Sequence, residues 1–312
     1  MNRSLPPREP TDVIVPLGDF DDNWLYRYSA VVSCMFVVDD VLDVNILRST
    51  LEALVEKPGW RKLGSRLRCN ALGRLECHIP AEFTPDRPAI RYSLVVHLVR
   101  KASHSIASRL PERSEKSAVM IDSTELPSLM HPPDSPTKLD HFLDTNEPLL
   151  GLHIVKFTDA TMITISWPHI LFDIMGLADL LNAWTLMLQG RGGDIRTPHG
   201  VDNDPLAKLG LCSGELYNLR DRRMSWPSVI AYGLRTWLRF RLSKKQHRMV
   251  HVPAWYLKLL RETALQELSA DGQNQDTTFL SEGDILCAWW ARLSVSHLEM
   301  DSERPVALEN GL

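Results

Sequence analysis

The sequence is poor in cysteine and has no paired cysteine motif. Its five cysteines are odd in number and irregularly spaced, and none forms a Cys-x-x-Cys pair. This usage favours a reduced, intracellular setting over a disulfide framework. The positions are Cys34, Cys69, Cys77, Cys212 and Cys287.

Long apolar runs and a strong charge of one sign are also missing. No uncharged apolar stretch approaches the ~20 residues that span a bilayer, and the first residues hold no apolar core of a signal peptide. The net charge of -4 gives no electrostatic reason to expect nucleic acid. We therefore expect a cytoplasmic protein that does not bind nucleic acid. Its 312 residues, 44% of them hydrophobic, suffice for one large or two ordinary domains.

Several motifs of common enzymes are absent. There is no Gly-x-Ser-x-Gly, which argues against a hydrolase nucleophile elbow. The glycines of 189–193 precede no Gly-Lys-Ser/Thr and favour a helix end over a nucleotide cradle. His247 and His251 have metal-ligand spacing but lack the glutamate of a zinc-protease helix and a clear third ligand, so no metal is expected. The pairs 21–22 and 39–40 are more simply solvated aspartates in turns.

Apolar periodicity predicts an alternation of strands and helices. Residues 101–148 interrupt it with frequent proline, serine and charge, which predicts a long excursion with short helical pieces. The predicted strands are 29–38, 75–79, 90–98, 149–157, 162–167 and 250–253, and the turn 158–161 makes a hairpin of the fourth and fifth. The predicted helices are 43–55 with Asp43 as N-cap, 174–188, 255–268, and 281–293 with a capping box of Ser281 and Asp284.

The segment 226–242 is rich in aromatic residues and arginine. A basic aromatic helix can lie on an anionic membrane surface. A partly exposed helix whose apolar side packs on its own protein explains the same composition. We favour the second interpretation, so peripheral membrane contact is the alternative.

His169 and Asp173 stand four positions apart where an apolar strand gives way to a helix. Pro168 cannot donate to a sheet ladder and predicts the end of the strand. A histidine in that junction can face a cavity while rigid elements hold it. A second match, His297 with Asp301, lies in a polar run without such elements, and we interpret it as chance.

Two interpretations of His169 remain open from spacing alone. It is either a structural histidine at the edge of a core, with Asp173 capping the helix that begins at Ile174, or a general base. A neutral imidazole can accept the proton of an acceptor hydroxyl or amine while that group attacks a thioester carbonyl. The oxyanion of such a reaction needs separate donors, which the sequence does not identify.

Two segments in this order resemble a known family. Ser166-Trp-Pro-His-Ile-Leu-Phe-Asp-Ile-Met-Gly-Leu177 is similar to the His-x-x-x-Asp segment of the BAHD acyltransferases, in the fungal branch related to trichothecene O-acetyltransferases. Phe279-Leu-Ser-Glu-Gly-Asp-Ile-Leu-Cys-Ala-Trp-Trp-Ala-Arg-Leu293 is similar to a second segment of that branch. The resemblance runs from about residue 12 to the end of the chain.

The resemblance implies an α/β (α+β) fold of the chloramphenicol-acetyltransferase type, with two domains of mixed sheets flanked by helices. We expect the first domain at 1–200 and a partial second domain at 201–312. The resemblance further implies that His169 is the catalytic base in a channel between the domains, and that Asp173 supports the site by pairing with an arginine. It implies acyl-CoA as a co-substrate, no permanently bound cofactor, and a small-molecule acceptor. We expect a monomer.

The sequence departs from the family at two places. Ile174 stands where the family often has glycine after the aspartate, and the family's Asp-Phe-Gly-Trp-Gly segment is absent. We therefore expect a C-terminally truncated member with an incomplete second domain. The alternative function is a non-catalytic remnant that binds a ligand or partner. A condensation domain of a peptide synthetase shares the fold, but such domains typically have a second histidine where this chain has Pro168.

Overall fold

A computed structural model describes most of the chain. Contacts divide it into two compact units, Met1–Arg109 with Thr124–Lys244, and Leu110–Ser123 with Lys245–Leu312. The domain boundary predicted after residue 200 stays a prediction, because residues 200–203 lie outside the description. The described residues are 6, 8–23, 27, 31–110, 112, 114–120, 126–199, 204–209, 214, 223–244, 248–270 and 279–297.

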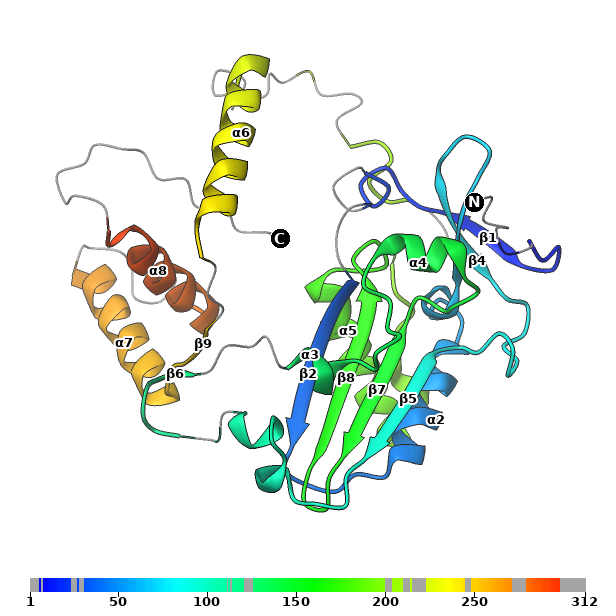
Figure 1. Ribbon diagram of the computed structural model, residues 1–312, viewed down its shortest axis with the longest axis horizontal. Coiled ribbons are helices and arrows are strands. Elements are labelled where there is room, and N and C mark those ends of the chain that lie inside the picture. The colour runs from blue at the N-terminus through cyan, green and yellow to red at the C-terminus, as the bar shows by residue number, and fades with distance from the viewer. Residues whose placement is uncertain are drawn as a thin grey trace. The chain divides into compact units, whose positions relative to one another are not determined.

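The first unit is built on a four-stranded mixed sheet in the order β2-β8-β7-β5 (Figure 1). The β5–β7 pair is parallel and the other two pairs are antiparallel. Strand β8 pairs on both edges and is buried along its whole length, including its polar residues Thr161, Thr164 and Ser166. The predicted hairpin and mixed sheet are confirmed. The strands are β2 (Val31–Val38), β5 (Arg91–Val96), β7 (Gly151–Lys156) and β8 (Thr161–Pro168).

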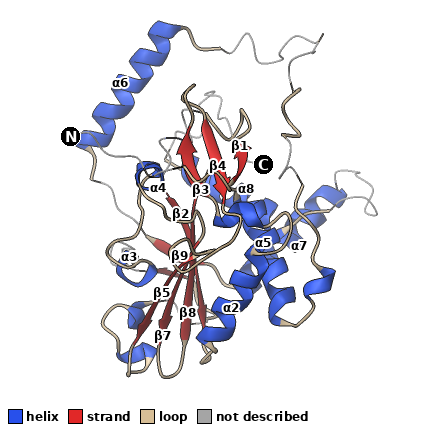
Figure 2. Cartoon of the chain, turned by 90° about the vertical axis from the view of Figure 1, so that its right-hand side faces the viewer, coloured by secondary structure: helices blue, strands red, loops and turns tan. Residues whose placement is uncertain are grey.

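Two helices, α2 (Val44–Val55) and α5 (Ile174–Leu188), cover one face of this sheet (Figures 1 and 2). The side chain of Asp43 caps α2 by accepting from the backbone N–H of Asn45 at 2.8 Å, so the predicted cap is confirmed. Apolar residues of both helices and of alternate strand positions form one core. Its most buried members include Leu51, Leu54, Leu152, Ile154, Ile165, Trp167 and Leu180.

A smaller antiparallel sheet has the order β1-β4-β3. It packs with helix α4 (Leu139–Asp144) on a second apolar core that contains Leu67, Leu75 and Phe142. The sequence predicted β4 (Leu75–Ile79) but neither β1 (Val13–Pro16) nor β3 (Arg66–Cys69). Strand β3 was missed because its buried arginines break the apolar pattern.

The described parts of 101–148 contain short helical pieces, as predicted, and also the strand β6 (Ala118–Met120). On the face of the large sheet opposite α2 and α5, Figures 1 and 2 place α3 and α4. The helical pieces within this range are η2 (Lys101–Ser103), η3 (Ala107–Arg109), α3 (Pro127–Met130) and α4. Two further short helices of the first unit lie elsewhere in the chain, η1 (Arg61–Gly64) and η5 (Gly192–Asp194).

Helix α6 (Trp226–Leu242) has the predicted bounds and begins at a Ser225 cap. Its predicted packing on the same protein is not observed among the described residues, where none of its side chains is buried and Trp226 is 79% exposed. The ranges that flank it, 215–222 and 245–247, lie outside the description. Over the described part of the chain, every helix is too short or too polar to span a bilayer.

The second unit combines a two-stranded antiparallel ladder with a helical pair. Strand β6 (Ala118–Met120) pairs with β9 (Met249–His251). Helices α7 (Ala254–Ala270) and α8 (Glu282–Val295) pack together, with Tyr256 and Trp289 edge to face at 6.5 Å between ring centroids. The predicted capping box of Ser281 and Asp284 is confirmed.

Candidate functional site

His169 lies in a short turn between β8 and α5. The indole Nε1 of Trp167 donates to the carbonyl of Phe172 at 2.8 Å, and the two rings stack with centroids 4.6 Å apart. The backbone N–H of Leu171 donates to the carbonyl of Pro168 at 2.9 Å. These contacts fix the backbone on both sides of His169, whose side chain is half-buried. The turn therefore holds the imidazole on a rigid mount.

Asp173 caps the helix that follows the turn. Its Oδ1 accepts from the backbone N–H of Gly176 at 2.9 Å, and its side chain is exposed. Of the two interpretations that the spacing left open, helix capping is therefore observed for this residue. Among the described residues, no arginine forms an ion pair with Asp173 within 4.0 Å, so its arginine partner stays a prediction.

Gly176 is required by the same turn. A Cβ at this position would lie 2.5 Å from the Cβ of Phe172, closer than real Cβ contacts come. The first turn of α5 can therefore lie against Phe172 only because residue 176 has no side chain. Sequence reasoning passed over this glycine, which stands three residues after Asp173 rather than directly after it.

The motif turn is anchored in both cores of the first unit. Trp167 is buried in the core under α2 and α5, and Ile170 is buried in the core of the smaller sheet. Leu171 packs against both cores. His169 therefore stands between two independently packed anchors.

Charged groups surround the histidine. Protein atoms desolvate the carboxyl group of Asp21 and raise its pKa, although the side chain still reaches solvent. Lys62 opposes this rise in the pKa of Asp21, Asp204 and Asp173 reinforce it, and His169 opposes it. These couplings put Asp21 in the electrostatic surroundings of His169, with Lys62 acting on Asp21.

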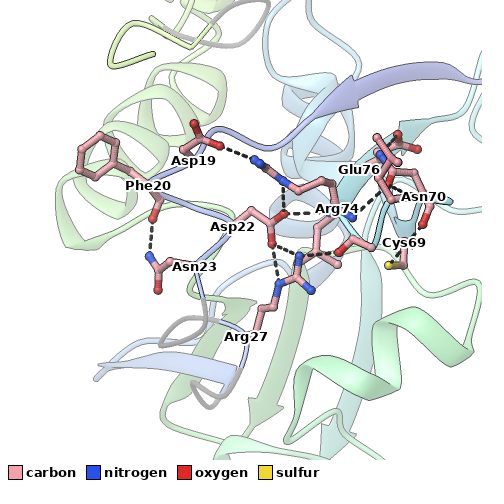
Figure 3. Close-up of polar contacts among 12 residues, drawn as sticks. Asp19, Phe20, Asp22, Asn23, Arg27, Cys69, Asn70, Arg74 and Glu76 are labelled. Carbon is pink, nitrogen blue, oxygen red and sulfur yellow. Dashed lines mark hydrogen bonds and ion pairs between the residues drawn. The ribbon is translucent and has the colours of Figure 1, made fainter. Parts of the chain in front are cut away.

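The neighbouring carboxylate, Asp22, is fully buried and clamped (Figure 3). It accepts from Arg27 Nε at 2.6 Å, from Arg74 Nε at 2.8 Å and from the backbone N–H of Leu75 at 3.1 Å. Arg74 also binds Asp19 at 2.6 Å. The prediction that 21–22 are solvated turn aspartates is therefore wrong for Asp22. Its arginine partner at position 74 is remote in sequence, so no local pattern revealed the clamp.

A cavity of about 280 Å³ borders the motif turn. Its walls are mainly apolar, and Lys62, Asp179 and His199 contribute polar groups. This cavity can take a small apolar group beside the turn that carries His169. Its apolar lining includes Trp60, Leu63, Leu171, Phe172, Leu180 and Pro198.

The described residues contain no group of three or more His, Cys, Asp or Glu side chains that could hold a metal ion. Of the histidine pair with metal-ligand spacing, His247 lies outside the description. His251 bonds through Nε2 to the carbonyl of Ser114 at 2.8 Å. The four described cysteines, which exclude Cys212, are free.

The sequence matches no protein-family model. It is 40% identical over 315 residues to Transcriptional regulator calD of Penicillium decumbens, which covers 98% of this chain and 61% of calD. It is 35% identical over 311 residues to Acetyltransferase adrJ of Penicillium rubens, covering 98% of this chain and 62% of adrJ. The chain thus spans about three-fifths of the length of these curated relatives.

The fold is similar to that of a solved enzyme structure. The crystal structure of F. graminearum TRI101 with coenzyme A and T-2 mycotoxin superposes with a TM-score of 0.53, covering 92% of this chain and 62% of TRI101 at 10% identity. This likeness shows the predicted chloramphenicol-acetyltransferase-like fold. The chain is therefore a homologue of fungal proteins that are named acetyltransferases or a transcriptional regulator, and it shares the fold of TRI101.

Proposed function

We propose that the chain is an acyl-CoA-dependent acyltransferase that acylates a hydroxyl or amine of a small-molecule acceptor. His169 is its general base and Asp173 supports the turn. The observation that carries the proposal is the place of His169, half-buried between two cores at the exit of β8, in a homologue of named acetyltransferases. TRI101, which has the same fold, was solved with coenzyme A and a mycotoxin.

The proposed reaction proceeds in one ternary complex. The imidazole of His169 takes the proton of the acceptor hydroxyl or amine as that atom attacks the thioester carbonyl of acyl-CoA. The tetrahedral intermediate then expels the CoA thiolate, which receives the proton from the imidazolium. General-base help of this kind typically contributes roughly 10²–10⁴ in rate. The contacts of Trp167 and Phe172 keep the imidazole in place through both steps.

Two other functions make different predictions. The name of calD raises transcriptional regulation, but a net charge of -4 gives no general electrostatic attraction for DNA. A non-catalytic remnant would bind a ligand without turnover. The homology to several proteins named acetyltransferases, together with the fold shared with TRI101, favours the enzyme over both.

The test is release of free CoA thiol from acetyl-CoA by the 312-residue protein, measured with a panel of small-molecule alcohols and amines. We expect His169→Ala to lower the rate at least about 100-fold. His297→Ala is the matched control, because His297 belongs to the chance His-x-x-x-Asp match, and we expect an unchanged rate. Equal turnover by His169→Ala and the parent chain would remove His169 from the mechanism. DNA binding without turnover would favour regulation.

The cytoplasmic location and the monomeric state remain proposals. Size-exclusion chromatography with light scattering tests the second, and the mass of one chain is 35.5 kDa. A dimer mass would overturn it.

A further inference from the structure

The face of the large sheet opposite α2 and α5 has two rows of aligned polar residues. In the first row, Ser33 pairs with Ser166, Ser166 with Gly151, and Gly151 with Arg91. In the second row, Met35 pairs with Thr164, Thr164 with His153, and His153 with Ser93. Paired residues of neighbouring strands project to the same side. We call the polar members the polar ladder: Ser33, Arg91, Ser93, His153, Thr164 and Ser166.

Three members of the polar ladder are buried, and the other three, Ser33, Arg91 and Ser93, are partly exposed. His153, Thr164 and Ser166 are each at most 6% exposed. Their immediate neighbours along the strands, among them Ile154 and Ile165, point to the other face and pack in the core under α2 and α5. The strands therefore separate an apolar face from a polar one, with Ser166 three residues before His169.

Arg91 brings a positive charge to the polar ladder without a carboxylate partner. Its Nη1 donates to Ser135 Oγ at 3.1 Å and its Nη2 to Ser166 Oγ at 3.2 Å. A Cβ on Gly151 would lie 2.9 Å from Nη2, so the glycine lets the guanidinium cross β7. Among the described residues Arg91 forms no ion pair within 4.0 Å, and Glu147 and Asp134 act on it only through longer-range attraction.

Arg66 and Arg68, two other buried arginines of this unit, contact backbone carbonyls and an amide instead, although Nη2 of Arg66 also lacks a partner among the described residues. Arg66 donates to the carbonyls of Asn146 and Gly64 at 3.1 and 2.6 Å. Arg68 donates to the carbonyls of Leu67 and Thr145 and to the side-chain oxygen of Asn146. The carbonyl oxygens on Arg66 and Arg68 only accept hydrogen bonds, whereas the two serine hydroxyls on Arg91 can also donate, and none of these partners carries a charge. Arg91 differs from Arg68 in its place, because its Nη2 contacts Ser166 within the polar ladder, whereas Arg68 contacts Thr145 and Asn146.

Three polar atoms of the polar ladder have no hydrogen-bond partner among the described residues. They are Ser33 Oγ, Thr164 Oγ1 and Arg91 Nε. A buried hydroxyl without a partner destabilises a fold. The histidines add no positive charge here: burial, His131 and Arg91 lower the pKa of His153 to about 4, and burial and Arg91 lower the pKa of His131. One uncompensated cation thus stands beside unused hydroxyl donors.

We propose that the polar ladder is a binding surface for an anionic oxygen group, a carboxylate or a phosphate, with Arg91 as its counter-charge and Ser33 and Thr164 as donors. The group belongs either to the acceptor, as a carboxylate, or to acyl-CoA, as a phosphate. Calling this ligand a substrate rests on the proposed acyl transfer, whereas the binding surface itself does not.

Calorimetric titration of the 312-residue protein tests the proposal. The probes are octanoate for a carboxylate, methyl octanoate as its uncharged control, and coenzyme A for phosphate. Arg91→Gln keeps hydrogen-bonding groups and removes the charge, and we expect at least a tenfold weaker binding of one anion with methyl octanoate unaffected. Arg68→Gln is the matched control and leaves every affinity unchanged. If the affinity falls for octanoate alone, the bound group is the acceptor carboxylate. If it falls for coenzyme A alone, the bound group is the phosphate.

Thr164→Val separates a ligand contact from a structural role. Valine has nearly the shape of threonine and removes an unpartnered hydroxyl, so we expect the melting temperature to stay equal or rise while the affinity for the same anion falls at least threefold. A purely structural hydroxyl would leave the affinity unchanged. His169→Ala should bind the anion as the parent chain does even when its turnover is lost, so failure of the proposed acyl transfer is distinguishable. Unchanged anion affinity in both Arg91→Gln and Thr164→Val overturns the proposal, as does a parent chain that binds neither anion.

Discussion

The two faces of the β2-β8-β7-β5 sheet differ in what their residues do. On the α2 and α5 face, residues such as Ile154 and Ile165 are fully buried in an apolar core. On the other face, their sequence neighbours His153 and Thr164 are almost as buried but polar, and Thr164 Oγ1 has no partner among the described residues. Strand alternation lets the same four strands carry both faces. The apolar face therefore contributes to the free energy of unfolding. The polar face lowers it, because buried polar atoms without partners are costly.

The sharpest test of this comparison uses adjacent residues of β8. Ile165→Ala removes a fully buried side chain from the apolar core and should lower the free energy of unfolding by about 2–5 kcal/mol. Thr164→Val, one residue away on the polar face, should leave it unchanged or raise it by up to ~1 kcal/mol. Urea unfolding of both variants measures the difference. Similar losses in both would show that the two faces contribute alike.

Asp22 is a buried polar group that does have hydrogen-bond partners, unlike Thr164 Oγ1 on the polar face of the sheet. Asp22→Ala leaves Arg27 and Arg74 without their shared carboxylate and should cost about 2 kcal/mol, less than for a deeply buried pair because both arginines are partly exposed. The control is Asp21→Ala on the next residue, which should be close to neutral. Urea unfolding measures the free energy of unfolding of both variants. Equal stability of Asp22→Ala and Asp21→Ala would show that the contacts of Asp22 do not stabilise the fold.

The polar face also predicts an acid sensitivity. The pKa of His153 is lowered to about 4 in the fold, against ~6.5 for an unperturbed histidine. The unfolded chain therefore takes up the proton first, and stability should fall as pH drops from about 6.5 towards 4, by up to about 3 kcal/mol. His153→Gln should flatten this part of the curve of melting temperature against pH. An unchanged slope in the variant would assign the sensitivity to other groups.

The smallest expected effect concerns the cap of α5. Asp173→Ala removes the bond to the Gly176 N–H and should cost about 1 kcal/mol. Asp173→Asn retains an acceptor at the cap and should restore most of that loss, which thermal unfolding can measure. If alanine and asparagine behave alike, capping contributes little and the aspartate has another role.

Local sequence patterns predicted many of the helices and strands, and they predicted the turn that carries His169. The bounds of α5, the Asp43 cap and the Ser281 capping box follow from signals within a few residues. The same holds for the turn that carries His169, because β8, Pro168 and α5 are contiguous in sequence.

Non-local pairings account for what the sequence did not reveal. Strand β3 has one core-facing leucine between two buried arginines, and Asp22 meets Arg74 across 52 residues. The polar ladder depends on strand order, since β2 lies beside β8 and Arg91 reaches Ser166 across Gly151. No periodicity within one segment encodes these neighbours.

The most direct test of the central claim, that the imidazole of His169 faces bound acyl-CoA, is histidine footprinting of the 312-residue protein with diethyl pyrocarbonate and mass spectrometry. We predict that His169 is modified in the free protein and that acetyl-CoA slows this modification, while the modification of His297 is unchanged. Equal modification of His169 with and without saturating acetyl-CoA would contradict the account.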